Sequence, residues 1–128
     1  MSDLRQTGIL IADDEGEMRN LLALILKTCG YTNIEFASDG QKAIEMLGKP
    51  QIGLAFLDIN MPGFSGIEVM TQVKDIRPNC YCVMVSGHSA LENVLAALNA
   101  GARAFIVKPY NQKKIGDILA KFERESVQ

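Results

Sequence analysis

The sequence predicts an α/β domain in which five parallel strands, each followed by a helix, form a three-layer sandwich. Five short apolar runs rich in β-branched residues alternate with longer segments whose apolar residues recur every three or four positions. The short runs are almost continuously apolar, which is typical of strands covered on both faces. Strands joined by helices must run parallel with right-handed crossovers, so the alternation predicts one parallel sheet between two helical layers.

Each predicted strand corresponds to one apolar run, at residues 9–12, 34–37, 54–57, 82–85 and 104–107. Only the second run contains a charge, Glu35, so we expect that strand at an edge of the sheet. The five helices are predicted from apolar stripes that begin at Met18, Ala43, Ile67, Leu91 and Ile115. Three glycines stand where helices are expected to end, and three prolines fall in connections: Gly30, Gly48 and Gly101, and Pro50, Pro78 and Pro109.

Length, charge and composition indicate a single soluble domain that binds neither nucleic acid nor a membrane. A chain of 128 residues predicts a single domain over residues 1–128, with no output domain. The net charge of -2 and the lack of a basic stripe argue against a nucleic-acid partner. No apolar run approaches the roughly 20 residues of a membrane span, and the first residues do not resemble a signal peptide, so we expect a cytoplasmic protein. The three cysteines, Cys29, Cys80 and Cys82, have apolar neighbours and are expected to be reduced core thiols.

Reactive side chains follow four of the five predicted strands. Asp13 and Asp14 follow the first strand, Asp58 the third, Ser86 the fourth and Lys108 the fifth. Ligands of open parallel sheets bind beyond the carboxyl ends of the strands, so these groups are expected to share one rim. Three close carboxylates repel one another, at about 4 kcal/mol per pair for a 4 Å separation and an effective dielectric of 20. Hard oxygen ligands without thiolates or imidazoles favour a magnesium-like cation.

The chemistry expected of this rim is phosphoryl transfer to a carboxylate. The first strand leads into Asp13-Asp14-Glu15, where a phosphate-binding loop would need glycines, so a bound phosphoryl group would have to be bridged by the metal. Asp58 is then a candidate nucleophile, with Lys108 and Ser86 to neutralise or hydrogen-bond the phosphoryl oxygens. The predicted product is an acyl phosphate.

From residue 9 to about residue 122 the chain resembles the response-regulator receiver domains of two-component signalling. Residues 58–66, Asp-Ile-Asn-Met-Pro-Gly-Phe-Ser-Gly, resemble the phosphorylation loop of the family. Asp13-Asp14, Ser86 and Lys108-Pro109 occur in its order and spacing, and the Asn60-Met61-Pro62 segment is similar to chemotaxis members. The resemblance implies a flavodoxin-like fold with strand order 2-1-3-4-5, an order taken from a chemotaxis member of the family.

The resemblance also implies the roles of the site residues. Asp58 would be the phosphoacceptor, assisted by Lys108 and Ser86, and the Lys108-Pro109 peptide bond would be cis. Mg²⁺, or Mn²⁺ in its place, would be bound by the carboxylates of Asp13, Asp14 and Asp58 and by the backbone carbonyl of Asn60. Of the first two, Asp14 would be the more direct ligand. The partners would be a sensor histidine kinase or a histidine phosphotransfer protein and a downstream protein, with the chain a monomer or at most a transient dimer. Catalysis would be limited to its own phosphorylation and dephosphorylation.

Further roles rest on the same resemblance. Ser86 would turn toward the phosphoryl group while Phe105 changes rotamer, which would reshape the face formed by the fourth helix, the fifth strand and the fifth helix. In the family, the positions that Asn60 and His88 occupy here influence dephosphorylation. Met18 would lie where receivers dock the kinase-side partner, although it also fits the apolar stripe of its helix.

Several alternatives compete with this interpretation. Asp13 or Asp14 could cap the first helix, Ser86 could cap the fourth, and Lys108 could be a solvated loop cation. A phosphorelay intermediate would pass the phosphoryl group on to a histidine phosphotransferase. An aspartyl phosphohydrolase would want a second aspartate where Asn60 stands, and a serine hydrolase built from Ser86, His88 and Asp58 would lack the usual nucleophile turn. A degenerate receiver would act as a constitutive binding module.

Overall fold

The computed structural model describes residues 4–87 and 91–126 and confirms the predicted α/β architecture. Five parallel strands form one sheet in the order β2-β1-β3-β4-β5, and β2, the strand that contains Glu35, lies at an edge as expected. The strands are β1 (Gly8–Ala12), β2 (Ile34–Ala37), β3 (Ile52–Asp58), β4 (Tyr81–Ser86) and β5 (Ala104–Val107). The helices are α1 (Gly16–Thr28), α2 (Gly40–Leu47), α3 (Gly66–Val73), α4 (Leu91–Asn99) and α5 (Gln112–Ser126).

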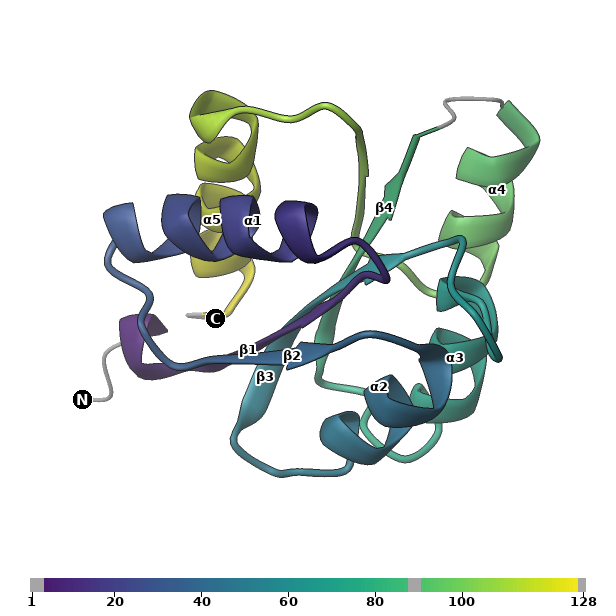
Figure 1. Ribbon diagram of the computed structural model, residues 1–128. Helices are drawn as coiled ribbons and strands as arrows, with labels where there is room; N and C mark the ends of the chain where they lie inside the picture. Colours follow the sequence, from purple (N-terminus) through teal and green to yellow (C-terminus); the bar gives the residue numbers. More distant parts are fainter. Residues whose placement is uncertain (1–3, 88–90, 127–128) are drawn as a thin grey trace.

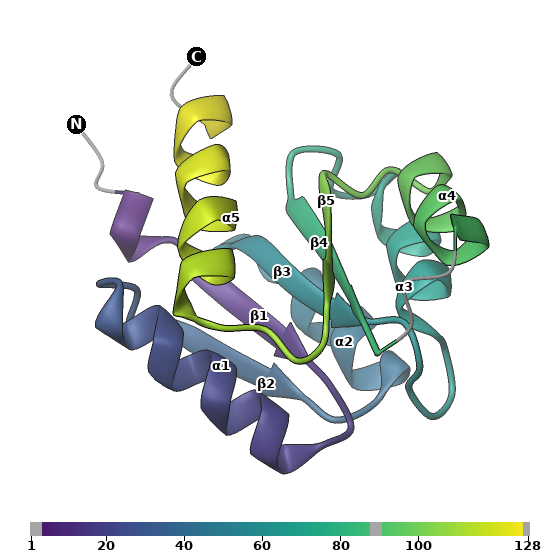
Figure 2. The ribbon, with the colours of Figure 1, turned by 90° about the horizontal axis from the view of Figure 1, so that it is seen from above.

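The helices cover both faces of the sheet, with α1 and α5 on one side and α2, α3 and α4 on the other (Figures 1 and 2). Successive residues of β1 pack into different cores because side chains alternate along a strand. Ile9 and Ile11 join the core beneath α1 and α5, whereas Leu10 and Ala12 join the core beneath α2 and α3. This two-sided burial explains why the strands are almost continuously apolar in sequence.

Three strands are longer than their apolar runs. β1 begins at Gly8, β3 begins at Ile52 and includes Asp58, and β4 runs from Tyr81 to Ser86. The apolar runs underestimate the strand lengths because glycine, tyrosine and the polar residues at the strand ends still pair with neighbouring strands. Asp58 and Ser86 are therefore the last residues of their strands, which fixes their backbone more firmly than a position in the following loop would.

Two helix ends confirm the predicted role of glycine. Gly30 and Gly101 have φ angles of 95° and 109°, and each is followed by a residue whose N–H bonds back to the last turn of the preceding helix. Gly48 also ends its helix, α2, but with a right-handed φ of -70°, so that helix ends without a left-handed residue. A short 3₁₀ helix at Leu4–Gln6 was not predicted.

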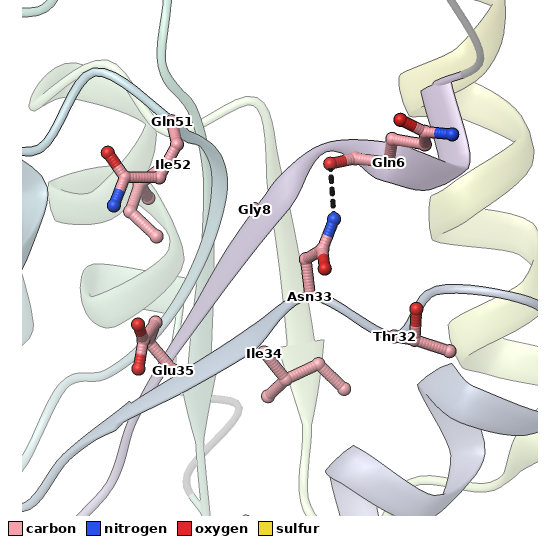
Figure 3. A pocket seen from close by; sticks show the side chains of 8 residues that line it. All are labelled: Gln6, Gly8, Thr32, Asn33, Ile34, Glu35, Gln51 and Ile52. Atoms are coloured by element: carbon pink, nitrogen blue, oxygen red, sulfur yellow. Dashed lines mark hydrogen bonds between the residues drawn. The ribbon is translucent and has the colours of Figure 1, made fainter.

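The opposite end of the sheet from Asp58 holds a cavity of about 350 Å³ (Figure 3). It is bordered by the amino ends of β1, β2 and β3, and the Asn33 side chain donates a 2.7 Å hydrogen bond to the Gln6 carbonyl beside it. Among the described residues that line this cavity, Glu35 is the only titratable one, in contrast to the cluster of charged groups around Asp58. Within the described residues, no helix is long and apolar enough to cross a membrane.

Candidate phosphoacceptor site

The carboxyl ends of the strands bring the predicted site residues together. β1 and β3 are neighbours with Ala12 opposite Leu57, so Asp13 and Asp58 leave the sheet side by side. The Lys108 N–H donates a 2.8 Å hydrogen bond to the Ser86 carbonyl, which holds the end of β5 against β4. The strand-end rule therefore placed Asp13, Asp58, Ser86 and Lys108 correctly at one rim.

Four carboxylates crowd this rim. Asp13, Asp14, Glu15 and Asp58 each offer an oxygen, and these oxygens all lie within 4.8 Å of one another. Asp13 and Asp58 are only 4% and 5% exposed, so water screens their mutual repulsion poorly. A set of hard oxygen ligands at this separation, two of them buried, fits a divalent cation such as Mg²⁺.

Lys108 is a cation already present among the carboxylates. Its Nζ lies 2.8 Å from Asp13 Oδ2, 2.9 Å from Asp58 Oδ2 and 3.1 Å from Glu15 Oε1. Burial alone would lower the pKa of Lys108, but the bonds to these three carboxylates raise it above its ordinary value, so the ammonium stays charged. Lys108 is thus an ion-pairing residue of the site, which excludes the alternative of a solvated loop cation.

The surroundings of Asp58 shift its pKa in both directions. Burial raises its pKa, with a further contribution from Asp13, whereas the bonds from Lys108 and from the Asn60 N–H act to lower it; the net shift is upward. The Asn60 N–H donates to Asp58 Oδ1 at 3.1 Å, and Oδ2 takes the Lys108 bond. Burial disfavours the charged form of Asp58. A bound cation, or conversion of the carboxylate to an acyl phosphate beside that cation, would offset this cost.

One backbone amide and one side chain hold Asp13 in place. The Glu15 N–H donates to Asp13 Oδ1 at 2.9 Å, and the Arg19 guanidinium donates to the Asp13 carbonyl at 2.6 Å. The N-cap of α1 is Glu15, whose own side chain makes no capping bond. The capping alternative for Asp13 is therefore partly right, since its carboxylate accepts an amide at the helix start while it also pairs with Lys108.

The loop after Asp58 is fixed at both ends. The Ile59 N–H donates to the Val85 carbonyl at 2.9 Å, and Ser65 and Glu68 form a reciprocal capping box that starts α3. Gly66 packs so closely that a Cβ there would lie 2.4 Å from the Asp58 carbonyl oxygen. The turn can close on the end of β3 because this position lacks a side chain.

A cavity of about 300 Å³ opens above the carboxylates, lined by Asp14, Glu15, Asp58, Asn60, Gly87 and Lys108. Ser86 lies next to that lining as the last residue of β4 and is fully buried. The Lys108-Pro109 bond is cis, as the resemblance implied. His88 lies outside the described residues.

Two predicted residues, Phe105 and Met18, are not among the residues that line this cavity. Phe105 in β5 is half-buried and packs against the core on the α2, α3 and α4 side of the sheet. Met18 is half-buried on α1, and its carbonyl accepts a 3.3 Å hydrogen bond from the Tyr110 hydroxyl. Burial and the nearby Asp13 raise the pKa of Tyr110 to about 12, so this hydroxyl remains a donor.

Sequence reasoning did not assign Glu15, Arg19 or Tyr110 to the site. Arg19 and Tyr110 fix the chain segments that carry Asp13 and Lys108, and Glu15 contacts Lys108 directly. The position of Glu15 next to two aspartates was the available signal. Its reach toward Lys108 depends on a side-chain rotamer, which no sequence pattern specifies.

Comparisons with known proteins agree with this geometry. Chemotaxis protein CheY of Thermotoga maritima is 31% identical over 116 residues, covering 91% of this chain and 97% of that protein. In two further curated relatives the match spans 26% and 27% of the protein. A CheY-like receiver domain protein from Methanospirillum hungatei JF-1 superposes with a TM-score of 0.81 at 33% identity, over 93% of this chain and 92% of that one.

A chain of the CheX–CheY–BeF₃–Mg²⁺ complex from Borrelia burgdorferi superposes with a TM-score of 0.85 at 29% identity, over 91% of this chain and 89% of that one. The sequence model of the response regulator receiver domain matches residues 9–120, a range that contains the carboxylates, Ser86 and Lys108. The strand order, the strand-end carboxylates and the lysine are thus found together with this match, and the chain belongs to the response regulator receiver domains.

Proposed function

We propose that the chain is a phosphorylation-dependent signalling switch in which Asp58 accepts a phosphoryl group from a phosphohistidine. The observation that carries this proposal is the placement of Asp58. It is a buried carboxylate at the end of a central strand, it lies 2.9 Å from a lysine, and it faces a cavity of about 300 Å³. Buried carboxylates with a raised pKa beside a specific charge partner are typical of functional sites.

In the proposed reaction an Asp58 oxygen attacks phosphorus, the bond from phosphorus to the donor histidine nitrogen breaks, and an acyl phosphate forms. Lys108 and the backbone N–H of Asn60 hold the Asp58 carboxylate in place, and Lys108 can follow the new phosphoryl oxygens. Mg²⁺, or Mn²⁺ in its place, would be held by Asp13, Asp14, Asp58 and the Asn60 carbonyl. Such an ion neutralises charge on phosphoryl oxygens when it is bound.

The proposed output is a change in protein docking on the face formed by α4, β5 and α5. Ser86 and Phe105 belong to the paired strands β4 and β5, so movement at the site has a short path to that face. On α4, Leu95 and Leu98 are 48% and 49% exposed, and a cavity of about 300 Å³ lined by Phe105, Lys114 and Ile118 lies beside α5. Exposed apolar side chains on α4 and a cavity between β5 and α5 suit a face that binds a protein partner.

The proposed partners are a sensor histidine kinase or a histidine phosphotransfer protein as donor, and a downstream protein as target. Similarity to chemotaxis proteins favours a downstream protein of a chemotaxis system as the target. The alternative is that the chain is a phosphorelay intermediate. We propose no turnover of external substrates beyond the phosphorylation and dephosphorylation of the chain itself. We also propose that the chain is cytoplasmic and mainly monomeric.

Asp58→Asn tests the proposal directly. With acetyl phosphate and Mg²⁺, the wild-type chain should be phosphorylated and this variant should not be, because an amide does not form the acyl phosphate. Phosphate-affinity gel electrophoresis and mass spectrometry of the intact chain would measure labelling, and excess chelator should abolish it. Asp75→Asn, an exposed change between α3 and β4, is the matched control and should be labelled normally.

Labelling of Asp58→Asn at the wild-type rate would show that Asp58 is not the acceptor. Sustained release of phosphate from small phosphate esters over many cycles would instead favour a phosphohydrolase. A phosphorelay role would appear as transfer of label from the chain to a histidine phosphotransfer protein.

A further inference from the structure

All three donors of the Lys108 ammonium have acceptors within hydrogen-bonding distance. A lysine ammonium offers three N–H groups, and the three carboxylate oxygens at 2.8, 2.9 and 3.1 Å match that number. For Lys108 to bond a phosphoryl oxygen on Asp58, one of these bonds must be released.

The three acceptors differ in how firmly they are held. The Asp13 and Asp58 side chains are 5% and 6% exposed, and a backbone N–H fixes the second oxygen of each. The Glu15 side chain is 63% exposed and makes the longest of the three contacts. An exposed ion pair is weakened by water and by the entropy of its long side chain, so Glu15 is the partner that yields most easily.

We propose that Glu15 is a positioning residue that holds Lys108 in the unphosphorylated form and competes with the phosphoryl group for its third donor. The inference rests on the proposed function of Asp58 and adds a regulator of the same site. Glu15 also lines the cavity that Asp58 faces, through which a phosphodonor would approach Asp58. Its negative charge therefore opposes an incoming anion twice, by occupying Lys108 and by direct repulsion at the cavity.

Glu15→Gln removes the charge at nearly constant size and leaves the buried carboxylates in place. Glu17→Gln is the matched control, because Glu17 lies in the first turn of the same helix, is exposed, and loses the same charge outside the cavity lining. Glu15→Asp keeps the charge and tests whether a shorter side chain restores the contact with Lys108.

Beryllofluoride, an anion that mimics the phosphoryl group, is the probe, and its binding can be followed by fluorine NMR at saturating Mg²⁺. Saturating Mg²⁺ separates the effect of Glu15 on beryllofluoride affinity from its effect on Mg²⁺ affinity. The Mg²⁺ affinity of each variant is measured separately by calorimetry. Glu15→Gln should bind beryllofluoride about two- to fivefold more tightly than the wild type, the range expected for loss of an exposed ion pair. Glu17→Gln should match the wild type, and Glu15→Asp should lie nearer the wild type than Glu15→Gln does.

The nitrogen NMR signal of Lys108 Nζ gives a second readout, which should change in Glu15→Gln and stay unchanged in Glu17→Gln before any anion is added. If Glu15→Gln and Glu17→Gln give equal affinities and equal Lys108 signals, the positioning role is wrong while the switch stands. A wild-type chain that is neither phosphorylated by acetyl phosphate nor bound by beryllofluoride would overturn both the proposed function and this inference.

Discussion

At the scale of single residues, Lys108 stabilises the fold as well as the site. It is the cation between Asp13 and Asp58, both almost completely buried. Removal of one partner from a buried charge group leaves an uncompensated charge, which typically destabilises a protein by about 3 kcal/mol or more. We therefore expect Lys108→Ala to lower the free energy of unfolding by about that amount in chelator, measured by urea denaturation, and Mg²⁺ to restore part of the loss.

Lys113→Ala is the matched control for this prediction. Its ion pair with Asp117 at 3.2 Å joins side chains that are 84% and 69% exposed, so its loss should change the free energy of unfolding by less than about 0.5 kcal/mol. Equal urea midpoints for the two variants in chelator would show that Asp13 and Asp58 do not depend on Lys108 for charge compensation.

The site residues that sequence predicted are those whose position depends on the sheet. Asp13, Asp58, Ser86 and Lys108 follow or end apolar strands, and the parallel sheet brings strand ends together whatever the side-chain rotamers are. Glu15 and Arg19 were missed because they reach the site through long side chains from α1. The switch role of Phe105 and the influence of His88 rest on the family resemblance alone.

At the scale of elements, the connection from β3 to α3 is built around the close approach of Gly66 to Asp58. An alanine Cβ would lie 2.4 Å from the Asp58 carbonyl oxygen and 2.9 Å from its carbon, and neither backbone atom can rotate away. Gly66→Ala should therefore destabilise the fold by about 1–3 kcal/mol and slow phosphorylation of Asp58 by acetyl phosphate. Urea denaturation and labelling kinetics would measure the two effects.

Gly116→Ala is the natural comparison within the same chain. Gly116 lies inside α5, and a Cβ there would have no neighbour within 4 Å. Alanine is favoured over glycine inside a helix by about 0.5–1 kcal/mol, so this variant should unfold at higher urea and be phosphorylated normally. A stabilising effect of Gly66→Ala, the same sign as at Gly116, would show that the backbone around Asp58 relaxes freely.

The elements themselves were predicted well where periodicity is strong, and less well at their ends. Helix ends at Gly30 and Gly101 followed from glycine's access to positive φ, but the start of β3 at Ile52 did not follow from its apolar run. Strand ends depend on pairing with neighbours, as in the bond from the Gly8 N–H to the Gln51 carbonyl at 3.0 Å. Such pairing is a property of the assembled sheet, which a local window of sequence does not contain.

At the scale of the whole molecule, the candidate site and the cavity of about 350 Å³ lie at opposite ends of the sheet. The carboxylates and Lys108 lie at the carboxyl ends of the strands, and the cavity beside Gln6 and Asn33 lies at the amino ends of β1, β2 and β3 (Figure 3). β4 and β5 connect the site with the face of α4 and α5, because Met84 pairs with Phe105 and Ser86 with Val107. A change at Asp58 should therefore pass sideways through β4 and β5 more than along the strands to the far end.

This arrangement predicts where beryllofluoride with Mg²⁺ will change the backbone amide signals in NMR. The largest shifts should fall on residues around Asp58 and then on β4, β5, α4 and the start of α5. The amides of Gln6, Asn33 and Gln51 at the far cavity should move least, and they serve as a control inside the same molecule. In Lys108→Ala the shifts around Asp58 should persist while those on α4 and β5 shrink, because the side chain that joins β5 to the phosphoryl mimic is gone. Shifts spread equally over both ends of the sheet, or centred on α2 and β2, would contradict transmission through β4 and β5.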